Sequence, residues 1–208
     1  VAFFIGNAIM VPAKSVVSIS VPLIASAWEK KDFEKIHSLY SKSSINQLIV
    51  GGVFFLCVWI NIDQVFLLLP EKFKAGKWVV FYIGISQLFN LASGLNGQII
   101  INSRYYRYDL FTSIFLVFIT VATNFLLIPK YGINGAAMAT ALSILLFNII
   151  RLVLIKIKMN MHPFSLQTIY VILVLIFLYI ILNFLPNTTY AFLDIFWRSS
   201  VVLMIFIP

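Results

Sequence analysis

Long apolar runs joined by short connections constrain this chain more than any other feature of its sequence. A bilayer core needs about 20 consecutive apolar residues per helix, and runs of that size follow one another along the whole chain. The runs are continuous rather than alternating, which favours helices over a barrel. The sequence therefore predicts an all-α integral membrane protein, a bundle of about seven transmembrane helices. The predicted spans are residues 2–27, 45–69, 77–102, 109–129, 133–155, 165–185 and a truncated 190–208.

Composition supports a membrane protein and argues against several other classes. Hydrophobic residues make up 62% of the chain and charged residues 11%, whereas a soluble domain carries about a quarter charged residues. The single cysteine, Cys57, lies in an apolar run, so an intrachain disulfide or a Cys-rich metal site is excluded. His37 and His162 are far apart in the sequence, and neither a phosphate-binding loop nor clustered carboxylates are present. We expect no catalytic residues, no metal, no cofactor and no enzymatic activity.

The net charge of +8 comes mostly from the connections between the apolar runs. This pattern is typical of a protein oriented in the membrane by Lys and Arg, and not of a nucleic-acid binder. One side is expected to hold Lys30, Lys31, Lys35, Lys42, Arg104, Arg107, Arg151, Lys156 and Lys158. The other side is expected to hold Lys72, Lys74, Lys77 and Lys130. The first, richer set is predicted to be cytoplasmic, so the first span runs from outside to inside.

The connection 29–42 is predicted to form a short helix on the inner membrane surface. Phe33, Ile36 and Tyr40 occur at helical spacing with charged residues around them, as in an interfacial amphipathic helix.

Lys14 is the deepest cation of the first span. Asn7, Lys14 and Ser18 fall within about 40° on one helical face, and Lys14 lies about 20 Å along the helix from Trp28. A lysine at this depth requires an anionic partner. The sequence leaves two partners open: a carboxylate on a helix outside this sequence, or a substrate phosphate in a cavity.

Amide side chains form a second polar stripe, on the third span. Gln87, Asn90, Gly94 and Gln98 share one face, with Gly97 beside it and Asn96 on the opposite face. This stripe is interpreted either as a cavity lining or as a seam between helices joined by amide hydrogen bonds.

Three further polar features lie near the ends of spans. Asp63 is either a cation or proton site, for example for a coupling ion, or a solvated residue at the membrane interface. Asp194 and Arg198 are four residues apart and are expected to pair. The Asn187-Thr188-Thr189 triplet matches a glycosylation acceptor, a pattern that is common by chance.

Residues 128–143, IPKYGINGAAMATALS, predict a tight corner followed by a closely packed helix. Pro129 and Gly132 favour a turn between two antiparallel helices. Gly135, Ala139 and Ser143 then form a ridge of small residues that allows another helix to approach.

The segment NFLLIPKYGINGAAMATALS (124–143) resembles the helix-turn-helix in the C-terminal half of polysaccharide (O-antigen type) flippases of the multidrug/oligosaccharidyl-lipid/polysaccharide exporter superfamily. VPAKSVVSISVPLIASAWEKKDFEKI (11–36) resembles the eighth helix of that family, and ISQLFNLASGLNGQIIINSRYYRYDL (85–110) resembles its tenth. The resemblance implies a two-lobed exporter of the bacterial inner membrane. This chain would be its C-terminal lobe plus two extra helices, without the N-terminal lobe.

The resemblance also implies a substrate, an oligosaccharide repeat unit on a polyprenyl pyrophosphate, and alternating access as the mechanism. Lys14 would contact the anionic linkage, and Arg104 and Arg107 would lie at the cytoplasmic entrance. Membrane lipid and other polysaccharide-assembly proteins, such as a polymerase, are the expected partners. Three alternatives stay open: a multidrug-type cation antiporter, a membrane glycosyltransferase, polymerase or ligase of the polysaccharide pathway, and a non-transporting scaffold.

Overall fold

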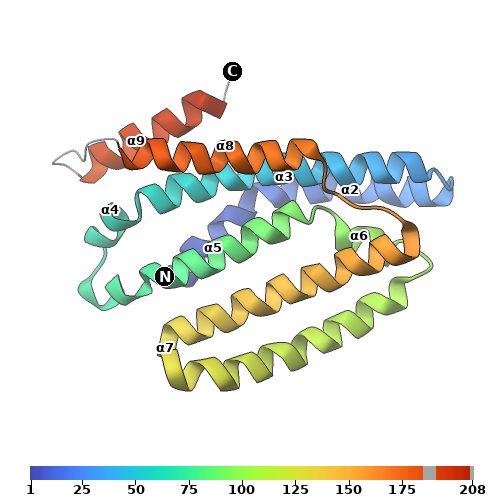
Figure 1. Cartoon of the computed structure of the whole chain (residues 1–208), viewed down its shortest axis with the longest axis horizontal. Helices are drawn as coiled ribbons and strands as arrows, with labels where there is room; N and C mark the ends of the chain where they lie inside the picture. Colours follow the sequence, from blue (N-terminus) through green and yellow to red (C-terminus); the bar gives the residue numbers. More distant parts are fainter. Residues whose placement is uncertain (185–190, 207–208) are drawn as a thin grey trace.

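The computed structural model describes residues 1–184 and 191–206, and these residues form helices and connections without any strand (Figure 1). The α-helices are α1 (Ala2–Asn7), α2 (Val11–Glu29), α3 (Phe33–Ile60), α4 (Ile62–Leu67), α5 (Lys77–Ala92), α6 (Asn96–Ile101), α7 (Tyr106–Met159), α8 (Leu166–Asn183) and α9 (Ala191–Phe206). Two 3-10 helices, η1 (Ala8–Met10) and η2 (Glu71–Gly76), precede α2 and α5. The prediction of an all-α fold is confirmed for this part of the chain.

Within the described residues, four helical segments are long and apolar enough to cross a membrane. They are Ala2–Glu29, Phe33–Ile60, Tyr106–Met159 and Leu166–Asn183. The third is 54 residues long and contains Gly132, whose φ of 56° and ψ of −129° are not helical. The chain folds back there, so α7 is a hairpin of two antiparallel arms (Figure 1).

The corner predicted at Pro129 and Gly132 is confirmed, and so is close packing by the small residues that follow it. Gly135 is buried, and a Cβ atom on it would lie 2.1 Å from the backbone oxygen of Leu127 on the opposite arm. Ala139 and Ser143 are also buried. The Ser143 hydroxyl lies 3.3 Å from that of Thr123, which joins the arms.

The surface helix predicted for residues 29–42 is wrong. Asp32 caps α3, its carboxylate accepting a hydrogen bond of 3.0 Å from the backbone N–H of Lys35, and the helix continues unbroken to Ile60. Ile36 and Tyr40 are completely buried in a cluster that includes Ile24 of α2. Their apolar face covers neighbouring helices rather than lipid headgroups.

The helix that covers the start of the second predicted span, 45–69, begins earlier in the chain, at Phe33. Ser43 and Ser44, just before this predicted span, and Gln47, inside it, are all buried on α3. The Ser44 hydroxyl donates a hydrogen bond to the backbone oxygen of Ala92, which ties α3 to the end of α5. At the other end α3 stops at Ile60, and the short α4 follows.

The third predicted span, 77–102, is interrupted by a break between α5 and α6. Gly94 has a φ of 60°, and a Cβ atom there would lie 3.2 Å from the backbone oxygen of Tyr40. A glycine is required at this point because the backbone is left-handed and α3 approaches closely. Beyond the break, Asn96 lines the same pocket as Asn90 and Gln98, so the prediction that Asn96 faces away from the polar stripe is wrong.

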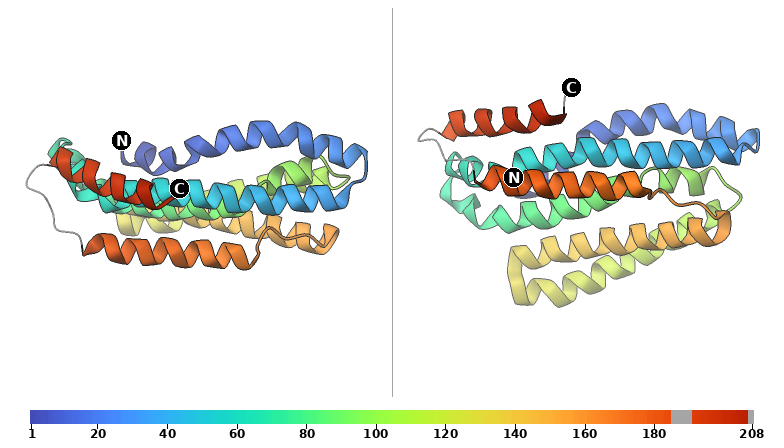
Figure 2. Two further views of the ribbon diagram at one scale, coloured as in Figure 1. Left: turned by 90° about the horizontal axis from the view of Figure 1, so that it is seen from above. Right: turned by 45° about the horizontal axis from the view of Figure 1, so that its top comes forward.

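Helix α5 lies at the centre of the bundle. It contacts α1, α3 and the α7 hairpin, while α3 also contacts α2, α8 and α9. Seen from above, α2 and α8 lie on opposite sides of α3 (Figure 2).

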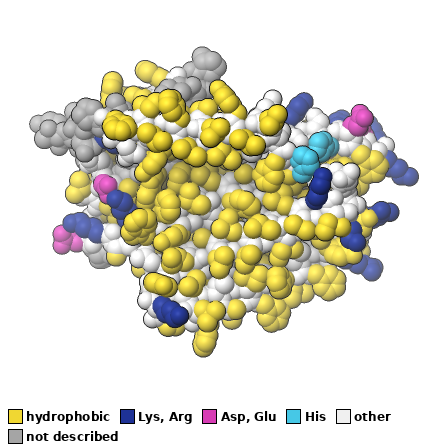
Figure 3. Space-filling model, viewed as in Figure 1, with side chains coloured by type: hydrophobic (Ala, Val, Ile, Leu, Met, Phe, Trp, Pro, Cys, Tyr) yellow, Lys and Arg dark blue, Asp and Glu magenta, His cyan; other side chains and the backbone are white. Residues whose placement is uncertain are grey.

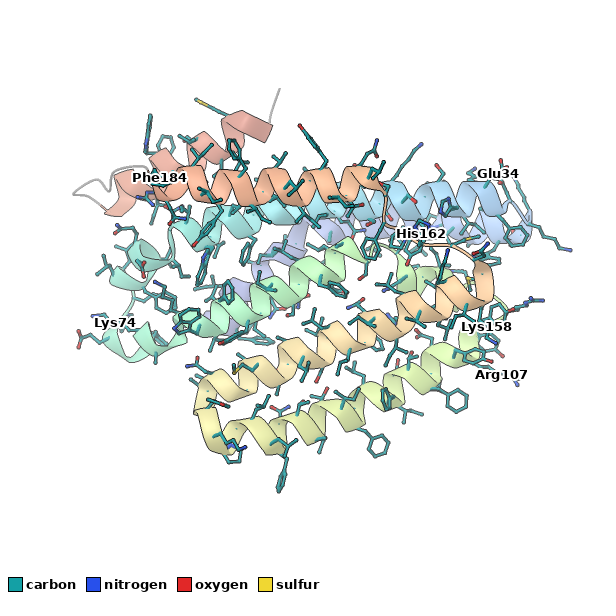
Figure 4. The ribbon with its side chains drawn as sticks, viewed as in Figure 1. Glu34, Lys74, Arg107, Lys158, His162 and Phe184 are labelled. Atoms are coloured by element: carbon teal, nitrogen blue, oxygen red, sulfur yellow. The ribbon has the colours of Figure 1, made fainter. Side chains whose placement is uncertain are left out.

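The exterior has the distribution of polarity expected in a bilayer. Hydrophobic side chains cover most of the face in Figure 3, and the charged side chains gather toward two opposite ends. Of the labelled residues in Figure 4, Glu34, Arg107 and Lys158 lie at one end and Lys74 lies at the other. Arg107 and Lys158 of the predicted cytoplasmic set therefore lie at the opposite end from Lys74 of the other set.

Three sequence expectations involve residues beyond this description. The Asn187-Thr188-Thr189 triplet and the end of the seventh predicted span lie outside the described residues. So does the side chain of Asp194, the expected partner of the buried Arg198.

Candidate functional site

A polar pocket of about 340 Å³ opens beside the break between α5 and α6. Helices α2, α3 and α7 supply its other walls. Four residues predicted from the sequence line it: Lys14, Ser18, Asn90 and Gln98. Three polar residues that the sequence analysis did not assign to a site line it too: Gln47, Asn96 and Arg151. Residues from five helices thus contribute to one pocket.

The remaining two predicted residues form a hydrogen-bonded row that leads to the pocket. The Gln87 amide nitrogen donates to the Asn7 side-chain oxygen at 2.7 Å. Asn90 in turn donates to the Gln87 side-chain oxygen at 3.2 Å. The row joins α1 to α5, so these amides serve as a seam between helices at one end and as a pocket wall at the other.

Lys14 projects from α2 into this pocket without a compensating charge. Its side chain is exposed, and it has no hydrogen bond or ion pair with any described residue. The next turn of the helix adds Ser18, whose hydroxyl bonds back to the Ser15 backbone oxygen at 3.1 Å. Lys14 is therefore available to an anionic partner from outside the described chain.

Gln47 is a polar side chain with an unused donor. It is 4% exposed, and its amide nitrogen is buried without a hydrogen-bond partner among the described residues. Buried amide groups are nearly always hydrogen-bonded, and a lost partner is costly. A ligand or water in the pocket would satisfy this donor. Gln47 lies inside the predicted span 45–69, and an amide within an apolar run is the signal that could have indicated a site there.

Arg151 reaches the pocket from the second arm of α7. Its guanidinium pairs with Asp109 of the first arm and lies 4.0 Å from the Phe147 ring centroid. A Cβ atom on Gly97 would lie 2.8 Å from one of its terminal nitrogens, so the absent side chain makes room for the guanidinium. Asp109 and Arg151 are equally far in sequence from Lys130 at the corner. Residues at equal distances from the corner lie side by side when the two arms are antiparallel, so the sequence spacing predicts this ion pair once the hairpin is known.

Asn96 lies at the start of α6 and links the pocket to α7. Its side-chain nitrogen donates to the side-chain oxygen of Asn148 at 2.9 Å. Its own side-chain oxygen accepts from the backbone N–H of Gly97 at 2.6 Å. This double bonding fixes the amide at the pocket wall.

The structure does not bring the other predicted site residues to this pocket. Asp63 is exposed and forms an ion pair with Lys77, at 2.5 Å. Arg104 donates a 2.7 Å hydrogen bond to the Tyr105 hydroxyl, and Arg107 lies 5.9 Å from the Tyr106 ring centroid. Both arginines are exposed. Arg107 lies at the same end of the bundle as Lys158 (Figure 4), and Arg104 lines a pocket together with Lys158.

The described pocket lining combines one uncompensated ammonium group, one guanidinium paired with a carboxylate behind it, and several amides. None of these lining residues is acidic. Such a surface suits a ligand that carries negative charge and many hydroxyl or carbonyl groups. Compared with protein-family models, with curated proteins and with solved structures, the chain gives no match.

Proposed function

We propose that this protein moves a lipid-linked oligosaccharide from the inner to the outer leaflet of a bacterial inner membrane, for polysaccharide biosynthesis. The observation that carries the proposal is the uncompensated Lys14 in a polar pocket whose described lining holds no acidic residue. The resemblance of residues 11–36, 85–110 and 124–143 to polysaccharide flippases supports the same reading.

The chemistry of the cargo explains why such a pocket is useful. A pyrophosphate and a string of sugars cannot cross hydrocarbon, because the loss of hydration costs many kcal/mol. In the proposed mechanism Lys14 receives the anionic linkage and the amides of Gln47, Asn90 and Gln98 replace water around sugar hydroxyls. The polyprenyl tail stays in the lipid.

The architecture proposed with this function has two lobes, of which this chain provides the C-terminal one with seven spans. Alternating access then arises from rocking of one lobe against the other. In this reading the pocket beside the α5–α6 break is one half of a central cavity. The other half comes from the N-terminal lobe.

A multidrug-type exporter of cations is the nearest alternative, and the described pocket favours the flippase. A cationic drug needs a carboxylate or an aromatic cage, whereas the charges that line this pocket are those of Lys14 and Arg151. The placement of an unpaired ammonium group there would repel such a substrate.

Complementation of a flippase-deficient strain by the full-length protein tests the proposal. Lys14→Ala is expected to abolish polysaccharide export while the protein stays in the membrane at its normal level. Lys14→Arg is expected to retain part of the activity, because the charge is kept although its geometry changes. Lys130→Ala, which removes an exposed cation at the hairpin corner, is the matched control and should export normally.

Two results would contradict a role of Lys14 in substrate binding. One is normal export by Lys14→Ala. The other is loss of Lys14→Ala from the membrane that is reversed when an acidic residue elsewhere in the full-length protein is neutralised. Lys14 would then be one half of a structural ion pair.

A further inference from the structure

A second pocket, of about 840 Å³, lies at the end of the bundle. The turn from α2 to α3, the connection from α6 to α7 and the C-terminal end of α7 meet there. Figure 4 places Lys158, Arg107 and Glu34 at this end. The pocket is distinct from the one beside the α5–α6 break, since the two have no lining residue in common.

The pocket has an excess of positive charge. Lys31, Arg104 and Lys158 line it, against the single carboxylate of Glu29. None of these four residues forms an ion pair with another described residue. Like charges gathered without counter-ions raise the energy of the protein, and an anion bound among them lowers it.

Aromatic rings contact two of these cations, and one aromatic residue adds a hydrogen-bond donor to the pocket. The Arg104 guanidinium lies 4.9 Å from the Tyr105 ring centroid, and the Lys158 ammonium lies 5.7 Å from that of Tyr108. Trp28 also lines the pocket, and its indole N–H is buried without a hydrogen-bond partner among the described residues. An indole nitrogen can only donate, so this group requires an acceptor that the described chain does not supply.

The backbone conformation of Lys31 also supports a binding site in this pocket. Its φ is 55°, a left-handed conformation directly after the C-cap of α2. Glycine or asparagine usually occupies this position, because other residues are strained there. A strained residue with its side chain at a pocket is a pointer to function.

The surroundings identify the kind of anion. Tryptophan and tyrosine are typical of the bilayer boundary, and basic clusters at that depth attract anionic lipid headgroups. The exposed apolar side chain of Phe33 lines the pocket and offers acyl chains a surface. We propose that this pocket binds the phosphate of an anionic phospholipid headgroup, with Lys31, Arg104 and Lys158 as its cationic partners. The inference goes beyond the proposed function and holds whatever the protein transports.

Lipid binding to the full-length protein in neutral detergent tests this proposal. The probes are phosphatidylglycerol and phosphatidylcholine with identical acyl chains, and native mass spectrometry measures the bound lipid. Phosphatidylglycerol is expected to bind at least tenfold more tightly than phosphatidylcholine. The triple variant Lys31→Gln, Arg104→Gln and Lys158→Gln should lose this preference.

The matched control removes three exposed lysines that do not line the pocket: Lys35→Gln, Lys42→Gln and Lys156→Gln. It changes the net charge equally and should keep the preference within about twofold. An equal loss in both triple variants would overturn the proposal in favour of diffuse attraction between charges. Equal binding of the two lipids by the unchanged protein would overturn it as well.

A single substitution separates ligand binding from folding. Lys31→Gly relieves the left-handed strain, so its Tm without lipid should rise. It also removes a cation, so the further rise in Tm that phosphatidylglycerol produces should shrink. An undiminished rise would remove Lys31 from the site. If millimolar inorganic phosphate raises Tm as much as phosphatidylglycerol and displaces it, the ligand is free phosphate and the lipid proposal is wrong.

Discussion

Arg151 and Asp109 form an ion pair across the α7 hairpin, although 42 residues separate them in the sequence. Their side chains are 15% and 18% exposed, so the pair is largely removed from solvent within the chain. The same guanidinium lines the polar pocket. The pair therefore connects the stability of the hairpin to the shape of the candidate site.

Removal of one partner of this pair is expected to destabilise the protein. Asp109→Asn leaves a buried guanidinium without its counter-charge, which costs about 3 kcal/mol, the lower end of the range for buried pairs. The double variant Asp109→Leu with Arg151→Met should recover most of this loss, because both charges are gone. The Tm of the purified protein in detergent measures the effect.

The matched control for the ion pair is Glu71→Gln, which breaks the exposed contact of Glu71 with Lys74. An exposed pair contributes little, so the Tm should hardly change. If Asp109→Asn has the same Tm as the unchanged protein, the ion pair does not contribute to stability and the prediction is wrong.

The corner of the hairpin gives a prediction about packing. Gly135→Ala places a methyl carbon 2.1 Å from the Leu127 backbone oxygen, and this clash is relieved only if one arm of the hairpin moves. Overpacking of this kind costs about 1–3 kcal/mol. A lower Tm and a lower level of protein in the membrane are expected. Ala122→Ser, an exposed change on the first arm, is the control and should behave normally.

The direction of the helices in the membrane follows from the cation bias. In a Cys57→Ala background, a cysteine introduced as Glu34→Cys is expected to be shielded from an impermeant thiol reagent applied to the outer face, because the end rich in Lys and Arg is predicted to be cytoplasmic. A cysteine introduced as Ala75→Cys should react. Both positions are exposed. Glu34 and Lys74, the neighbour of Ala75, lie at opposite ends of the bundle (Figure 4), so the reverse pattern of labelling would invert the topology.

Helical periodicity predicted a shared face for some of the polar residues that line the pocket. Lys14 and Ser18 are one turn apart on α2, and both line the same pocket. The same reasoning failed for Asn96, because the periodicity was extended through the break at Gly94. It also failed for Ile36 and Tyr40, where an amphipathic pattern has the same form whether its apolar face meets lipid or other helices.

The sequence by itself determined the all-α membrane class and the hairpin corner. Both follow from local chemistry: continuous apolar runs must satisfy their own backbone in lipid, and a proline and a glycine favour a turn. Only the tertiary structure decided that Gln47, Asn90 and Arg151 meet beside the α5–α6 break. That meeting depends on the left-handed Gly94 and on the packing of helices far apart in the chain, and contacts of that kind leave no periodic pattern in the sequence.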